Sequence, residues 1–158
     1  MPKYKRLSAS ELKELEKEFV DFLVVNGITA DDWVNLKKVD LDKANKVIDH
    51  FSDVVWEGVL RKTKFLELRS KQEIKTFQCL DNKMILMGIK IDDPSIDLTT
   101  REGYDKAQVS IPNTEMYTQE KSYKFPREKE LFEMILKGCY ISDGKLFKAI
   151  ALTIAEQN

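Results

Sequence analysis

The sequence predicts an α+β fold, in which N-terminal helices pack on a three-stranded antiparallel β-meander and a pair of helices follows at the C-terminus. Three observations support it: capped helical patterns in the first third, three short apolar-rich runs with tight turns between them, and two helical patterns at the end. A length of 158 residues suits a single domain spanning residues 1–158. Within it, residues 126–158 could form a semi-independent helical lobe.

Helix-start signals mark the N-terminal third of the chain. Ser8 and Glu11 form a capping box, and the apolar residues that follow at helical spacing predict one helix that ends before Gly27. Thr29 caps a short second helix. A longer helix is predicted over residues 41–62.

The middle of the chain contains three extended runs, at residues 63–69, 73–80 and 83–91. The segments between them, "SKQ" and "DN", are short enough for tight turns, which predicts an antiparallel meander. The third run has apolar residues on both of its faces. This pattern is typical of a strand that is central in the sheet or covered on both sides.

The segment after the meander combines cap signals with prolines. Thr99 is predicted to cap a helix with Glu102 at the capping-box position, and Pro112 is predicted to end it. Residues 113–124 are polar and aromatic, which indicates either a flexible or a strand-like excursion. Pro126 opens the first of the two C-terminal helices.

Charge and cysteine content restrict the compartment and the partners. With 26 basic and 27 acidic side chains the net charge is -1, which argues against binding nucleic acid or anionic lipid through the whole surface but leaves a local patch open. No apolar run is long enough for a signal peptide or a membrane span. Cys79 and Cys139 lack CxxC spacing and are expected to be buried thiols in a reducing compartment. A cytoplasmic protein without membrane contact is predicted.

Helical-wheel positions divide the predicted helix 41–62 into two faces. His50, Asp53 and Glu57 share the charged face, where they could bind a divalent metal or form a solvated surface with Arg61. The solvated surface is favoured, because the chain has no second histidine. Gly58 is expected to allow close approach by another element on the apolar face. That face consists of Val47, Phe51, Val54, Val55 and Gly58.

Signatures of common enzymes are missing from the sequence. The six glycines form neither a phosphate-binding loop nor a nucleophile elbow. We therefore predict no catalytic residue, no cofactor and no metal site, and the sequence favours a protein that is not an enzyme.

Three motifs resemble an uncharacterised family of small bacterial proteins, a domain of unknown function. They are "ITADDW", "FSDVVWEGVLRK" and "IDLTTREGY". The resemblance runs from Lys3 to about Tyr104. It implies a bacterial cytoplasmic protein and brings no activity, cofactor or catalytic residue. The residues within the motifs are where a functional surface is expected.

The leading functional hypothesis is a non-catalytic protein-interaction or regulatory module. Trp56 projects opposite the apolar face of its helix, with Leu60 beside it, so this second apolar strip is either packed or a docking surface. Together with the third motif, it predicts a binding surface for an unknown protein or assembly. The predicted docking residues are Trp56, Leu60, Thr99, Glu102 and Tyr104.

The alternative hypothesis is an RNA- or ribosome-associated factor that uses the basic stretch 61–75. Lys64, Arg69 and Lys71 could contact phosphates there. The same residues are common on exposed strand edges and turns, where they prevent edge pairing. The sequence leaves the partner and the oligomeric state open.

Overall fold

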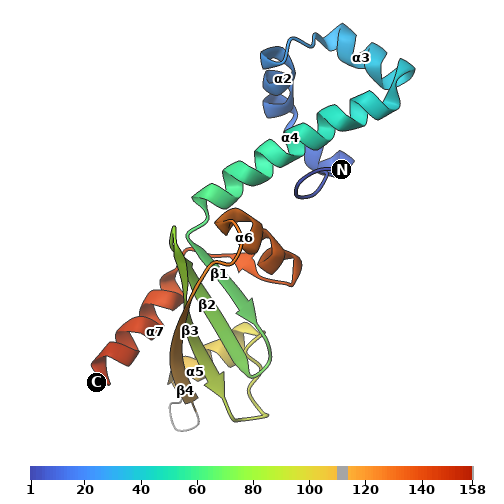
Figure 1. Cartoon of the computed structure of the whole chain (residues 1–158). Coiled ribbons are helices and arrows are strands. Elements are labelled where there is room, and N and C mark those ends of the chain that lie inside the picture. The colour runs from blue at the N-terminus through green and yellow to red at the C-terminus, as the bar shows by residue number, and fades with distance from the viewer. Residues whose placement is uncertain (110–113, 158) are drawn as a thin grey trace. The chain divides into compact units, whose positions relative to one another are not determined.

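The computed structural model describes residues 1–109 and 114–157; Pro112, predicted to end a helix, lies outside them. The α+β class is confirmed: the described residues form seven helices and a five-stranded antiparallel sheet (Figure 1). The helices are α1 (Ala9–Glu14), α2 (Glu16–Val25), α3 (Ala30–Val39), α4 (Leu41–Lys62), α5 (Arg101–Val109), α6 (Arg127–Leu136) and α7 (Lys145–Glu156). The strands are β1 (Phe65–Arg69), β2 (Glu73–Cys79), β3 (Lys83–Ile91), β4 (Thr114–Ser122) and β5 (Tyr140–Ile141).

The chain forms two compact units, Met1–Arg61 and Lys62–Asn158, which we call the helical unit and the sheet unit. The single domain expected over residues 1–158 stays a prediction. The C-terminal helices α6 and α7, expected as a lobe over 126–158, belong to the sheet unit, and α7 contacts β2, β3 and β4.

Local caps in the helical unit follow the sequence. Ser8 and Glu11 form the predicted capping box, and Thr29 forms another with Asp32. The prediction of one continuous first helix was wrong, because the chain leaves helical geometry at Leu15 (φ -102°, ψ 24°) and divides into α1 and α2. Hydrophobic spacing did not reveal this break, because the apolar pattern continues through it.

Aromatic rings hold the helical unit together. Phe19 of α2 lies 5.0 Å from Phe51 of α4 and 5.2 Å from Trp33 of α3, measured between ring centroids. Phe22 packs on Phe51 at 5.3 Å. Such pairs add about 0.5–1.5 kcal/mol each beyond the burial of area. Trp33 is therefore a packing residue of this unit.

The sheet has the strand order β4-β3-β2-β1-β5, with every neighbouring pair antiparallel. The predicted meander is confirmed as its central part, β1 to β3. The predicted number of strands was wrong, because β4 pairs with β3 and the two-residue β5 pairs with β1. The polar composition of β4 gave only a weak strand signal, and β5 is too short for any periodicity.

One face of the sheet carries the main core of this unit. Ile74 of β2, Ile89 of β3 and Leu98 are buried there together with Ile150 of α7. Figure 1 shows α7 lying along the sheet. Partly buried side chains extend this core, among them Met116 of β4.

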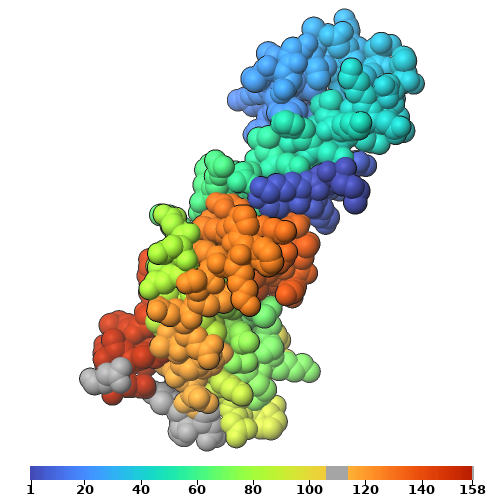
Figure 2. Space-filling view, viewed as in Figure 1, coloured from blue at the N-terminus to red at the C-terminus, as the bar shows by residue number. Residues whose placement is uncertain are grey.

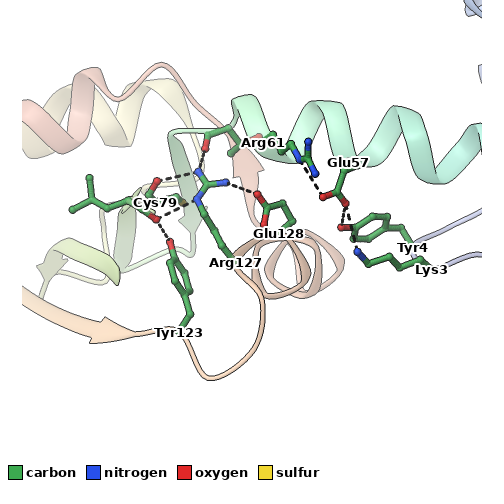
Figure 3. A network of polar contacts seen from close by, with 10 residues as sticks. Lys3, Tyr4, Glu57, Arg61, Cys79, Tyr123, Arg127 and Glu128 are labelled. Atoms are coloured by element: carbon green, nitrogen blue, oxygen red, sulfur yellow. Dashed lines mark hydrogen bonds and ion pairs between the residues drawn. The ribbon is translucent and has the colours of Figure 1, made fainter. Parts of the chain in front are cut away.

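A nearly buried arginine joins the ends of several segments in the sheet unit (Figure 3). The guanidinium of Arg127, with 11% of the side chain exposed, donates to the carbonyl oxygens of Leu80 (3.2 Å), Cys79 (3.0 Å) and Thr63. The hydroxyl of Tyr123 also donates to Leu80, at 2.9 Å. Burial raises the pKa of the Cys79 thiol to about 12, so this group stays protonated.

Candidate functional site

The first residues of the chain lie along α4 and form what we call the N-terminal strap, residues 3–7. Two consecutive backbone amides of the strap donate to the carboxylate of Asp53, at 2.8 and 2.9 Å. The guanidinium of Arg6 donates to the buried carboxylate of Asp49 at 2.5 and 3.0 Å. Acidic residues at four-residue spacing on α4 thus receive a basic segment. Figure 2 shows the start of the chain, in dark blue, lying along this helix. We had not predicted this contact, although the spacing of Asp49, Asp53 and Glu57 was a usable signal.

Glu57 contacts the side chains of Lys3 and Tyr4 at the start of the strap. Its carboxylate accepts a hydrogen bond from the hydroxyl of Tyr4 and pairs with the ammonium of Lys3 at 3.6 Å and with Nε of Arg61 at 3.2 Å (Figure 3). The hydrogen bond from Tyr4 is the main reason that the pKa of Glu57 lies below its ordinary value, and the two cations act in the same direction.

The strap makes the stability of the helical unit depend on pH. The hydrogen bond from Arg6 lowers the pKa of Asp49 in the folded chain, so the ionised carboxylate stabilises the fold above its unfolded pKa of about 3.9 and loses this effect as the pH falls through the folded value. We expect Asp49→Asn to lower the midpoint of thermal unfolding by several degrees at pH 7. The difference from wild type should shrink below about pH 4. A difference that is constant across this range would contradict the assignment.

An open groove of about 440 Å³ lies between the strap and α4. Val54 and Gly58 form an apolar floor that is open to solvent. Val54 is 50% exposed, and Gly58 is exposed, with no atom outside the backbone of its own helix within 4 Å of where a Cβ would stand. The prediction that Val54 and Gly58 face the core was therefore wrong; Phe51, on the same predicted face, is buried. The groove is lined by Lys3, Tyr4, His50, Asp53, Val54, Glu57, Gly58 and Arg61.

The groove brings together the three residues that could have formed a metal or acid-base cluster. His50, Asp53 and Glu57 all line it. Among the described residues, however, no three His, Cys, Asp or Glu side chains are arranged to hold a metal ion. Both carboxylates accept hydrogen bonds from the strap, and the ring of His50 packs on Phe22 at 5.4 Å.

Comparison with known proteins finds one family. The model of a family of unknown function, DUF6495, matches residues 1–155. The chain belongs to this family. No curated protein and no solved structure matches it. Membership of DUF6495 confirms the resemblance to a family of unknown function and assigns no activity or ligand. In the described part of this DUF6495 chain, no helix is long and apolar enough to span a membrane.

The residues expected to form a docking surface on the DUF6495 chain differ in exposure. Leu60 is fully buried and Trp56 is half-buried. Tyr104 is partly buried against the sheet core, and the guanidinium carbon of Arg69 lies 4.7 Å from the centre of its ring. Leu60 has no exposed area to offer a partner. A docking role for the other residues stays a prediction.

The predicted cap of α5 was wrong by one residue. Thr100 is the capping residue, since its hydroxyl accepts from the amide of Gly103 at 3.0 Å. Thr99 instead donates to the side chain of Asp97. Thr99 and Glu102 are exposed. Two adjacent threonines offered two cap registers, and the turn at Asp97 selects the second.

The basic residues of the RNA hypothesis are not gathered into one patch. Lys64 precedes β1 and Lys71 follows it, so they stand at opposite ends of a five-residue strand. Arg69 pairs with the buried Glu67 at 3.5 Å and lies over the ring of Tyr104. RNA binding by these residues stays a prediction.

Proposed function

We propose that the protein is a non-catalytic protein-interaction module whose groove on α4 binds a helical segment of another protein. The observation that carries the proposal is the uncovered apolar floor at Val54 and Gly58. Several valines in the helices of this unit are exposed, and Val54 is the one that lines the groove. Here the neighbouring strap is held to one side by Asp53 and Glu57, so the floor stays open to a ligand.

The shape of the floor favours a helix as the ligand. His50, Val54 and Gly58 recur every four residues along one side of α4. Rows at this spacing bound the grooves into which the ridges of a second helix pack. Gly58 has no side chain, and this allows the backbone of the ligand to approach closely. An amphipathic helix could place an apolar side chain over Val54.

The charges at the rim indicate what should flank that apolar side chain. Lys3 and Arg61 are 60% and 69% exposed, whereas their shared partner Glu57 is 27% exposed. A guanidinium has five N–H donors, and the ion pair with Glu57 uses the Nε of Arg61. The remaining donors of Arg61 are suited to a carboxylate of the ligand. A partner helix with an acidic residue one turn from its apolar anchor is the best match.

The proposed compartment is the bacterial cytoplasm. Cys79 and Cys139 are buried thiols that form no disulfide, and burial raises the pKa of both. Such thiols are compatible with a reducing environment. The bacterial source rests on the resemblance of the three sequence motifs alone.

Affinity capture with a matched pair of variants tests the function. Val54 and Val20 are 50% and 49% exposed, and both lie in helices of the helical unit. We expect wild type and Val20→Glu to capture a protein from native lysate that Val54→Glu does not capture. With that protein purified, Val54→Glu should bind it at least about tenfold more weakly than wild type does. Quantitative mass spectrometry of nuclease-treated and untreated captures measures this.

Two outcomes would count against the groove. If all three baits recover the same proteins in equal amounts, the floor at Val54 does not bind them. If nuclease treatment removes every captured protein, association through RNA replaces the proposal. Circular dichroism of both variants verifies that the helices are intact.

A further inference from the structure

The outer edge of β4 is a long strand edge that no described strand covers. β4 pairs with β3 over nine consecutive residue pairs, from Lys83 with Ser122 to Ile91 with Thr114, without a bulge. It stands at one end of the strand order and contains no proline. Monomeric proteins normally blunt such an edge with prolines, bulges, very short strands or charged side chains. β4 has none of the first three devices, and its charged side chains, Glu115, Glu120 and Lys121, include both signs.

The hydrogen-bond pattern shows which residues of β4 face outward. The amide of Ile91 donates to Gln72 at 2.8 Å and that of Leu80 to Lys83 at 3.0 Å, so the odd-numbered residues of β3 bond to β2. The even-numbered residues of β3 therefore bond to β4, where they stand opposite odd-numbered residues. It follows that the backbone groups of Met116, Thr118 and Glu120 point away from the sheet.

We propose that this edge pairs with the same edge of a second copy, giving a symmetric dimer with a continuous ten-stranded sheet. In one register, charged side chains of the two β4 strands stand opposite side chains of opposite sign. Antiparallel pairing about a two-fold axis at Thr118 uses all nine residues of β4 and sets Thr118 opposite Thr118 of the second copy. The same register sets Glu115 opposite Lys121 of the second copy, and Lys121 opposite Glu115.

The two ion pairs lie on one face of the sheet, on either side of the axis. Both residues are exposed in the single chain, Lys121 to 64%, and the ammonium of Lys121 lies 3.8 Å from Glu130. In the dimer, Glu115 and Lys121 form a pair that is not hydrogen-bonded through the backbone, with Cα atoms about 4.5 Å apart, so their side chains can meet. A shift of the register by two residues removes both pairs. The charges therefore select the register with the longest overlap.

Charge exchange tests both the dimer and its register. Lys121→Glu and Glu115→Lys each put two like-charged pairs across the seam and should raise the dimer dissociation constant about tenfold or more. The double variant Glu115→Lys with Lys121→Glu restores opposite charges and should recover the wild-type value to within about threefold. Sedimentation equilibrium at low salt measures all four proteins. Failure of the double variant to recover would overturn this register.

Cysteine cross-linking gives a second measurement that does not depend on affinity. Thr118→Cys places two thiols opposite each other with Cα atoms about 5.5 Å apart, within disulfide range, whereas Glu120→Cys places them several residues apart. We expect mild oxidation to link Thr118→Cys into a dimer and to leave Glu120→Cys unlinked. The native cysteines are buried, and the wild-type chain is the control. Equal linking of both variants would contradict the register.

Thr118→Pro tests the role of the backbone itself. The amide of Thr118 points outward, so a proline there removes no hydrogen bond to β3 and is compatible with an edge strand. It should convert the dimer to monomer while the far-ultraviolet circular dichroism is retained. A wild-type chain that is monomeric up to about millimolar concentration would overturn the dimer. A dimer that is unchanged in Thr118→Pro would assign the contact to another surface, including the groove on α4.

Discussion

Replacing Arg127 by methionine is expected to lower the free energy of unfolding of the sheet unit by about 3–5 kcal/mol. The guanidinium donates to the carbonyl oxygens of Thr63, Cys79 and Leu80, which come from the start of β1 and the end of β2. Methionine fills a similar volume and donates nothing, so three largely buried acceptors lose a charged donor. Denaturant unfolding followed by circular dichroism measures the loss.

Two further variants separate the hydrogen bonds from the charge. Arg127→Lys keeps a cation, but an ammonium lacks the planar fork that reaches three carbonyls, so its effect should be intermediate. Arg101 is exposed at the start of α5, and Arg101→Met should change the stability by less than about 0.5 kcal/mol. Equal losses for Arg127→Met and Arg101→Met would show that the carbonyl contacts do not stabilise the unit.

The second large effect is expected from Gly103→Ala. A Cβ at Gly103 would stand 1.9 Å from the carbonyl oxygen of Asp97. That oxygen is held by the amide and the hydroxyl of Thr100, at 3.1 and 2.8 Å, so it cannot move aside without loss of the turn that caps α5. We expect destabilisation of about 1–3 kcal/mol, as for other overpacked sites.

Gly58 is the matched control for Gly103, because both glycines lie inside helices. A Cβ at Gly58 meets nothing within 4 Å. Alanine has the higher helix propensity, so Gly58→Ala should stabilise the helical unit by up to about 1 kcal/mol. The same substitution is thus expected to have opposite signs at the two positions. A stabilised Gly103→Ala would show that the turn at Asp97 adapts freely.

Local signals in the sequence predicted the local structure well. The capping box at Ser8, the cap at Thr29 and the turns of the meander are decided by residues a few positions apart, and each is present in the structure. The first helix was divided at Leu15, because a single residue can leave helical geometry without changing the hydrophobic spacing.

The groove could not be predicted, because it depends on which face of α4 is covered. A helical wheel identified the apolar stripe with Phe51, but it could not show that α2 covers Phe51 while Val54 and Gly58 stay exposed. The strap is a contact across about fifty residues of sequence, between Lys3 and Asp53. Only complementary charges indicated it, and such charges are also common on solvated surfaces.

The unequal lengths of the two sheet edges limit the size of an assembly built by strand pairing. β5, at the other end of the sheet, has two residues and pairs with β1 at Leu66 and Glu67. A strand of two residues offers too few backbone groups to hold another chain. Pairing through β4 therefore uses the longest edge among the described strands of each copy and leaves a third copy only the short edge at β5 and β1. This closure separates a finite dimer from the open-ended growth of fibrils.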